Sequence, residues 1–216
     1  MITLSPTSSI ALFLECPRCF WLDKVKGIAR PRGIFPSLPG GMDRVLKEHF
    51  DGHRAKKTMP PELDGFSGSL YGDIQRLDIW RDQFQGLQFH DPCGITLKGA
   101  IDDLFVTTEG LYAPIDFKTR GSPIKEDTHE FNRNQMDIYS LLLEKNGLKP
   151  AGFAILLYYS PRKVNASHNI EFHAEPVKIH TSTENALKVF RGACEVLKGG
   201  EPAPGKNCGF CGWGGW

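Results

Sequence analysis

The clearest hydrophobic pattern lies in the middle of the chain. Apolar residues alternate with polar ones or run together over residues 95–106 and 111–119, on either side of the letters TTEG. Two such runs joined by a short polar segment are typical of an antiparallel hairpin. The pattern therefore predicts two paired strands with Gly110 in the turn.

Helical spacing and further apolar runs flank this hairpin. Two short helices are predicted within residues 5–27, with Pro17 beginning the second, and another helix over 42–57. A long helix is predicted over 128–147, with Thr128 as its cap and Gly147 at its end. A last helix is predicted over 184–200, capped by Ser182 or Thr183. Strand-like runs occupy 152–160 and 170–179, and the Gly- and Pro-rich segments 27–41, 58–69 and 199–206 are predicted to be loops. This mixture of helices and strands predicts an α/β fold.

Composition narrows the class of protein. The chain has 216 residues, 40% of them hydrophobic, which suits a single domain over 1–216 with a sizeable core. Its net charge of +1 excludes a uniformly basic nucleic-acid coat, so a polyanion would have to meet a local patch. The sequence shows neither a secretory leader nor an apolar run that would span a membrane, and we expect a cytoplasmic protein without a membrane partner.

The hairpin carries acids among its apolar residues. Asp116 and Lys118 are two apart on one strand and share a face, whereas Asp102 and Asp103 are both flanked by apolar positions, so at least one faces buried surroundings. Because an unpaired buried carboxylate is costly, a Mg²⁺ ion between Asp102 and Asp116 would offset that cost. Lys118 would then orient a water molecule or stabilise charge on a phosphate.

Ordinary structural roles remain open for these residues. Asp-x-Lys is a common salt bridge in sheets, and Gly-x-x-Asp occurs a second time at residues 40–43. Gln135 and Tyr139 are one helical turn apart and could reach the hairpin together, or could be a partly buried polar pair. The order of the whole set favours a site.

Four segments carry a resemblance to a known family: GAID at 99–102, PIDFKT at 114–119, QMDIY at 135–139 and SSIALFLECPRCFWL at 8–22. Together they resemble the RecB-like branch of the PD-(D/E)xK nucleases. The resemblance implies a restriction-endonuclease-like core, in which helices flank a mixed central sheet. It also implies that Asp102, Asp116 and the carbonyl of Phe117 bind Mg²⁺ or Mn²⁺, that Lys118 serves catalysis, and that Gln135 and Tyr139 support the site.

The sequence departs from the family at one position. Many RecB-like members have a metal-binding histidine four residues after a glycine, but here Val45 follows Gly41 at that spacing. His49, one turn further, could replace it, or could be a solvated residue on the helix surface. Glu48 is a weaker candidate.

Two Cys-x-x-Cys pairs lie at opposite ends of the chain. Cys16 and Cys19 stand near the start, and Cys208 and Cys211 near the end, so a metal centre would join the two termini. The spacing favours zinc. The resemblance to the AddB and CRISPR-adaptation nucleases implies a 4Fe-4S cluster instead, although those proteins divide their cysteines one and three. The remaining Cys93 and Cys194 are expected to be ordinary core or loop thiols.

These observations predict a metal-dependent DNA nuclease. The resemblance implies action on single-stranded ends or flaps in repair, recombination, phage defence or CRISPR, with other repair or defence proteins as partners. Arg120 follows the Asp-x-Lys strand and is the best placed residue for a DNA phosphate, while Arg30 and Arg54 belong to basic runs. The alternatives are an inactive nuclease-like DNA-binding module, and a zinc-binding protein whose hairpin acids would be exposed and far apart.

Overall fold

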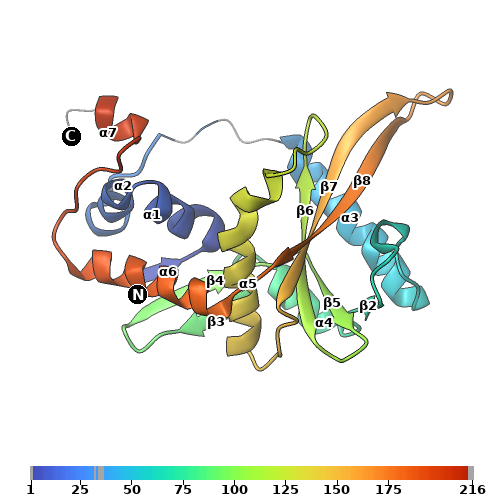
Figure 1. Ribbon diagram of the computed structural model, residues 1–216, viewed down its shortest axis with the longest axis horizontal. Coiled ribbons are helices and arrows are strands. Elements are labelled where there is room, and N and C mark those ends of the chain that lie inside the picture. The colour runs from blue at the N-terminus through green and yellow to red at the C-terminus, as the bar shows by residue number, and fades with distance from the viewer. Residues whose placement is uncertain (1, 32, 34–36, 214–216) are drawn as a thin grey trace.

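The computed structural model describes residues 2–31, 33 and 37–213 (Figure 1). Its strands form two sheets. The three-stranded sheet has the order β1 (Ile2–Leu4), β4 (Ile95–Gly99) and β3 (Leu87–His90), and the five-stranded sheet has the order β2 (Gly68–Leu70), β5 (Asp103–Thr107), β6 (Tyr112–Thr119), β7 (Phe153–Val164) and β8 (Ile170–His180). The larger sheet is mixed, because β6 and β7 run parallel and its other pairs run antiparallel.

Helices cover both sheets. The α-helices are α1 (Ala11–Glu15), α2 (Pro17–Trp21), α3 (Ser37–Lys56), α4 (Ile74–Arg81), α5 (Arg133–Lys145), α6 (Thr183–Lys198) and α7 (Gly209–Trp213), with shorter or wider helical turns at Pro6–Ile10, Leu22–Lys26, Pro61–Leu63 and Thr128–Asn132. The fold is therefore the expected α/β arrangement of a mixed sheet flanked by helices. Among the described residues, none of the helices has the length and apolar character needed to cross a bilayer.

Strand β7 divides the core into two layers. Ala154, Leu156 and Tyr158 are buried in the same cluster as α5, whereas Ile155, Leu157 and Tyr159 are buried with residues of α3. Successive side chains of a strand point to opposite faces, so a run that is apolar at every position belongs between two helical layers. Helices α5 and α3 consequently lie on opposite faces of the larger sheet.

The predicted hairpin is confirmed at its turn. Strands β5 and β6 pair antiparallel, the Leu111 amide bonds the Thr107 hydroxyl, and Gly110 has a φ of 74°. This left-handed conformation favours glycine because a Cβ would be strained there.

The prediction of a single strand over 95–106 is wrong. Residues 95–99 belong to the three-stranded sheet and 103–107 to the five-stranded one, and the chain changes sheet between them. The end of α4 causes the break, because it binds the intervening backbone: the Ile101 amide donates to the Trp80 carbonyl, and Arg81 Nε donates to the Asp102 carbonyl at 2.8 Å. The expectation that at least one of Asp102 and Asp103 faces buried surroundings is confirmed, because Asp103 is fully buried.

Most longer predicted elements are confirmed, with shifted ends. Pro17 begins α2, and Ser182 caps α6 by accepting from the Asn185 amide. Helix α5 begins at Arg133 because Thr128 starts a 3₁₀ turn instead, and α3 begins at Ser37, inside the predicted loop 27–41. The short elements β1, β2, β3, α4 and α7 were not predicted.

The two ends of the chain lie together. Figure 1 shows α7, in red, beside α1 and α2, in blue. Gly205 approaches the N-terminal segment so closely that a Cβ would lie 2.5 Å from the Glu15 carbonyl oxygen. Arg18 Nε pairs with Glu201 at 2.6 Å, and Trp21 donates to the Gly199 carbonyl at 3.2 Å. The C-terminal segment is therefore held at several points.

Candidate active site

The hairpin register brings two carboxylates together. The last paired residues are Asp103 and Ile115, and one step further along the antiparallel strands Asp102 faces Asp116. The ladder has ended there, so the Phe117 amide has no strand partner on this side. It donates instead to Asp102 Oδ2 at 2.8 Å. The end of the β5–β6 ladder thus places Asp102 against the strand that carries Asp116.

Asp116 and Lys118 share the face of β6 that points to α5. Lys118 Nζ lies 2.6 Å from Asp116 Oδ2, and only 5% of the Asp116 side chain is exposed. That oxygen is buried and, among the described residues, has an ion-pair neighbour but no hydrogen bond. A buried acceptor in this state can still take a ligand.

Helix α5 supplies two polar groups to the same face. The Gln135 amide donates to Asp116 Oδ1 at 2.7 Å and to the Tyr139 hydroxyl at 3.0 Å, and its carbonyl accepts from Lys118 at 3.1 Å. Gly99 makes room for the helix, because a Cβ there would lie 2.9 Å from the Tyr139 ring. The structure therefore brings together Asp102, Asp116, Lys118, Gln135 and Tyr139.

Burial and repulsion make these acids hard to ionise. Burial, followed by the charge of Asp116, raises the pKa of Asp102 to about 7, and burial also raises the pKa of Asp116 although Lys118 opposes it. Closely spaced carboxylates with raised pKa values are typical of sites that hold a cation. Together with Asp116 Oδ2, whose neighbour is the ammonium of a flexible lysine, they form an oxygen donor set that fits Mg²⁺ or Mn²⁺.

Two further charged residues lie at this site that sequence reasoning did not select. Lys47 Nζ lies 2.8 Å from Asp43 Oδ2 and 3.5 Å from Asp102 Oδ1. Asp43 and Lys47 are four residues apart on α3 and therefore share a face of that helix. The second Gly-x-x-Asp, at residues 40–43, was the available signal for Asp43.

Asp103 has a separate, structural role. It is fully buried and accepts from Arg54 Nη2 at 2.7 Å and from Arg81 Nη2 at 2.8 Å. Arg81 also donates to Asp51 and to the Asp102 carbonyl. This network fixes the backbone at Asp102, and it removes Arg54 from the residues available to a phosphate.

The structure does not bring His49 to the carboxylates. Its Nε2 lies 3.1 Å from Glu62, and its ring contacts those of Phe50 and His53. The reason lies in helix geometry: His49 is four residues after Val45, which is half exposed, so both share a face turned away from that of Asp43. Glu48 pairs with Arg44 at the surface.

Arg120 is exposed at the end of the Asp-x-Lys strand, and its backbone amide donates to the Tyr159 carbonyl. Its positive charge is close enough to oppose the raised pKa that burial gives Tyr158. The side chain therefore stands next to the site, without a role in the packing of the core.

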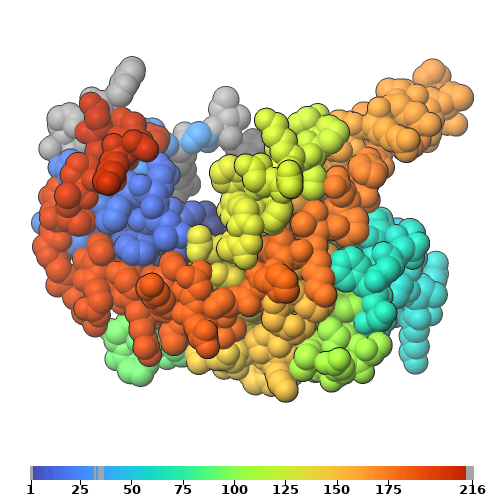
Figure 2. Space-filling view, viewed as in Figure 1, coloured from blue at the N-terminus to red at the C-terminus, as the bar shows by residue number. Residues whose placement is uncertain are grey.

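A cavity of about 540 Å³ opens beside Gln135. It lies between the N-terminal helical segment and the start of α5, where Figure 2 shows a hollow between blue and yellow-green surfaces. Its lining includes Thr7, Asn134 and Phe131, whose side chain is 86% exposed. The cavity leads from solvent to a residue that contacts Asp116.

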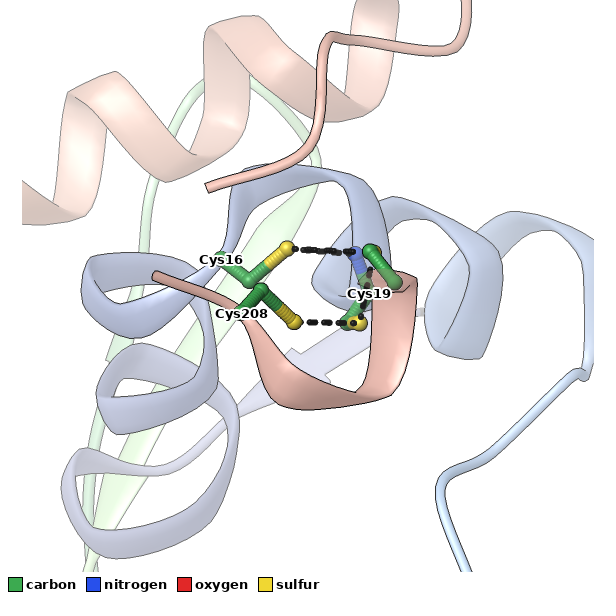
Figure 3. Close-up of side chains that lie close together, drawn as sticks. Cys16, Cys19 and Cys208 are labelled. Carbon is green, nitrogen blue, oxygen red and sulfur yellow. Dashed lines mark hydrogen bonds between the residues drawn. The ribbon is translucent and has the colours of Figure 1, made fainter. Parts of the chain in front are cut away.

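The four cysteines predicted to hold a metal form one cluster. Sγ atoms of Cys16, Cys19, Cys208 and Cys211 all lie within 4.8 Å of one another. Figure 3 shows Cys16 and Cys19 from the N-terminal helices facing Cys208 from the C-terminal segment. The observed separations are 3.7 Å for Cys16–Cys211, 3.6 Å for Cys19–Cys208 and 3.5 Å for Cys19–Cys211. These residues could bind a metal.

Backbone amides and an arginine donate hydrogen bonds to two of the four sulfur atoms, those of Cys16 and Cys208. Burial opposes ionisation of Cys16, but hydrogen bonds from the amides of Cys19 and Gly205 and from the thiols of Cys208 and Cys19 together lower its pKa to about 6. Arg30 Nη2 donates to Cys208 Sγ at 3.1 Å, so this arginine serves the cluster. Donors aimed at sulfur favour the thiolate, the form that binds metals, at Cys16 and Cys208, whereas burial raises the pKa of Cys19 and Cys211.

The other two cysteines are placed as expected. Cys194 is buried on α6 and Cys93 is half-buried in the turn before β4, with their sulfur atoms 3.4 Å apart. Burial raises the pKa of Cys194 to about 12, which keeps it a neutral thiol.

Comparison with known proteins identifies the family. The sequence profile of the PD-(D/E)XK nuclease superfamily matches residues 36–216. Eighteen chains of known structure also match; one, from the crystal structure of SSO0001, has 16% identity and a TM-score of 0.49, over 94% of this chain and 78% of that one. No curated protein matches. Because the family profile covers most of the chain, the protein belongs to the PD-(D/E)XK nuclease superfamily, whose members are nucleases that use divalent metals.

Proposed function

We propose that this protein is a divalent-metal-dependent deoxyribonuclease of the RecB-like branch. The observation that carries the proposal is that Asp102, Asp116 and Lys118 lie together where the β5–β6 ladder ends. Gln135 is hydrogen-bonded to Asp116 and to Lys118. The alternative interpretation, a zinc-binding protein whose Asp-x-Lys arose by chance, required hairpin acids that are exposed and far apart. That requirement is not met, because Asp116 is buried and its charge raises the pKa of Asp102.

Asp102, Asp116 and the Phe117 carbonyl would hold Mg²⁺ or Mn²⁺. The two backbone groups of a strand residue face the same side, so the Phe117 carbonyl points to the edge where its amide meets Asp102. When bound, the ion would polarise the scissile phosphate and lower the pKa of a water molecule.

The chain's own residues supply orientation and charge. Lys118 has its ammonium between Asp116 and Gln135, where it can direct a water molecule or stabilise negative charge on a phosphate. Gln135 holds Asp116 through Oδ1, and Oδ2, which has no hydrogen bond within the described part of the chain, keeps its ion pair with Lys118. Tyr139 is buried behind Gln135 and fixes its amide. The positioning depends on rigid elements, namely β6 and α5.

The cavity beside Gln135 supports a single-stranded substrate. Phe131 exposes an aromatic ring, on which a base can stack only when it is unpaired, and Asn134 offers an amide nearby. Arg120 would bind a DNA phosphate. Ends and flaps are the DNA structures that present unpaired bases, and they agree with roles in repair, recombination or CRISPR and phage defence, beside proteins of those pathways.

The four cysteines would hold one structural metal centre. A tetrahedral zinc with ligands at about 2.3 Å separates its sulfur atoms by about 3.8 Å, close to the observed spacing. A four-iron cluster binds one cysteine at each iron and would spread the sulfur atoms further. Spacing therefore supports zinc, and family resemblance supports 4Fe-4S.

A cleavage assay tests the proposed function. Linear single-stranded and double-stranded DNA would be incubated with the wild-type protein in Mg²⁺ or in Mn²⁺. Asp116→Asn and Lys118→Met, purified in parallel, are the controls for contaminating nuclease. We expect the wild type to degrade single strands faster and both variants to lose about a hundredfold or more of the rate. DNA binding with equal, negligible cleavage by all three proteins would favour the inactive DNA-binding module.

A further inference from the structure

We propose that Asp43 supplies a third carboxylate to the metal site formed by Asp102 and Asp116. The inference rests on the proposed function, and adds to it a residue from a different helix. It starts from a contact: one ammonium, that of Lys47, lies 2.8 Å from Asp43 and 3.5 Å from Asp102. One ammonium thus bridges the two carboxylates, and a divalent cation could take its place between them.

Ion pairs link the acids at this place. Lys47 contacts both Asp43 and Asp102, and Lys118 contacts Asp116. The site thus gathers three carboxylates around two ammonium groups, those of Lys47 and Lys118. This imbalance leaves negative charge that a divalent cation would neutralise.

A buried oxygen points to a ligand at this place. Asp116 Oδ2 lies in a residue only 3% exposed and has no hydrogen bond among the described residues. Lysine side chains are long and flexible, and Lys47 and Lys118 are 22% and 25% exposed. Lys47 can swing into solvent, and Lys118 can shift from Asp116 toward Gln135, when an ion takes their place beside the carboxylates.

The orientation of α3 explains why Asp43 takes this role. Phe50 is fully buried on that helix and packs on Phe117, with ring centroids 4.9 Å apart. Residues seven and four apart share a helix face, so Phe50, Asp43 and Lys47 all point toward the end of β6. Val45 and His49 point away from it. Packing of the core therefore turns Asp43, rather than His49, toward the hairpin acids.

The proposal has a chemical consequence. Three carboxylates and a backbone carbonyl form an all-oxygen shell, whereas a histidine would add a nitrogen that suits softer ions. We therefore expect Mg²⁺ and Mn²⁺ to be held through oxygen alone.

Direct titration with Mn²⁺ tests the role of Asp43 without measuring cleavage. The full chain, with its cysteine centre filled, would be titrated while free Mn²⁺ is followed by electron paramagnetic resonance. Asp43→Asn keeps the size of the side chain and should weaken binding at least tenfold. Asp43→His returns a metal-binding group and should bind more tightly than Asp43→Asn. Glu48→Gln, on the same helix and paired with Arg44 at the surface, is the matched control and should bind as the wild type does.

The outcomes separate this inference from the proposed function. Wild-type affinity in Asp43→Asn, together with lost binding in Asp116→Asn, would overturn the role of Asp43 and leave the proposed function standing. No Mn²⁺ binding by the wild type would overturn both. Thermal melting of each variant, measured without Mn²⁺, shows that it is folded. If Asp43→Asn does not fold, equal affinity of Asp43→His and Asp43→Ala would overturn the role instead.

Discussion

The side-chain amide of Gln135 donates a hydrogen bond to Asp116 Oδ1 at 2.7 Å, and so joins helix α5 to the strand that carries the acid. The same side chain accepts from Lys118 through its carbonyl oxygen. One residue thus sets the positions of a carboxylate and an ammonium. The relation makes Gln135 a positioning residue whose replacement has measurable consequences.

Replacing Gln135 by leucine should slow cleavage by about 10- to 100-fold, because Asp116 and Lys118 lose their common partner. The buried site would still hold its charges, so the variant should bind DNA as before. Cleavage rates at saturating DNA, together with binding measured separately, check this. A rate equal to that of the wild type would show that the Gln135 contacts do not position the acid.

The raised pKa of Asp102 predicts how stability depends on pH. In the folded protein without divalent metal this pKa is about 7, against an ordinary value of 3.8, so the folded state binds the proton more tightly than the unfolded state. The free energy of unfolding should therefore fall as pH rises from about 4 to about 7. Below that range both states are protonated and the penalty is absent.

Urea unfolding at a series of pH values measures this slope, in buffer freed of Mg²⁺ and Mn²⁺. Asp102→Asn cannot titrate and should show a flatter profile than the wild type. Added Mn²⁺ should stabilise the wild type most near neutral pH, because binding requires the ionised carboxylate. Identical pH profiles for the two proteins would contradict the environment assigned to Asp102.

The cysteine centre should contribute to folding rather than to catalysis. Cys19→Ser removes one of four ligands and should lower the free energy of unfolding by more than about 3 kcal/mol. Cys93→Ser, which removes a half-buried thiol outside the cluster, is the control and should cost about 1 kcal/mol. Urea unfolding of both variants measures the difference.

Absorbance and metal analysis of the anaerobically purified protein identify the centre. Broad absorbance in the visible region with four irons per chain would establish the cluster, and a colourless protein with one zinc would establish the ion. Four free thiols without metal would contradict a metal centre of either kind.

An exposed ring at the cavity should hold single-stranded DNA. Phe131→Ala should weaken binding of a single-stranded oligonucleotide by about 1–3 kcal/mol, because it removes a surface on which a base stacks. Phe84→Ala is the matched control. The Phe84 side chain is also exposed, at 78%, but it lies before β3 and does not line the cavity. Fluorescence anisotropy of a labelled oligonucleotide, in buffer containing Ca²⁺, measures the affinity of each variant for single-stranded DNA. Equal effects of the two replacements would exclude a stacking role for Phe131.

Local patterns of the sequence were sufficient for the elements that carry the motifs. The β5–β6 hairpin and α5 were predicted because each has a continuous run of apolar residues with its own turn or end signal. Strands such as β1 and β2 have three residues each, too few to show alternation. The break at residues 100–102 has no local signal, because contacts from α4 produce it.

The candidate site likewise combines residues placed by local sequence patterns with residues placed by tertiary packing. Asp116, Lys118 and Gln135 were predictable from their spacing, since a strand and the following helix set their faces. Asp43 was not, because its approach to Asp102 depends on how α3 packs against β6 through Phe50 and Phe117. The sequence offered His49 by its residue type, with a solvated position on the helix surface as the alternative, and the packed helix shows that its face is turned away.

A crystal of the protein grown with Mn²⁺ would test the central claim most directly. Anomalous scattering at the manganese edge locates the ion without reference to activity. The account predicts one peak bonded to carboxylate oxygens of Asp102 and Asp116, with Lys118 displaced from Asp116 Oδ2. A crystal saturated with Mn²⁺ that shows no peak between these two carboxylates, or carboxylates too far apart to bind one ion, would contradict it.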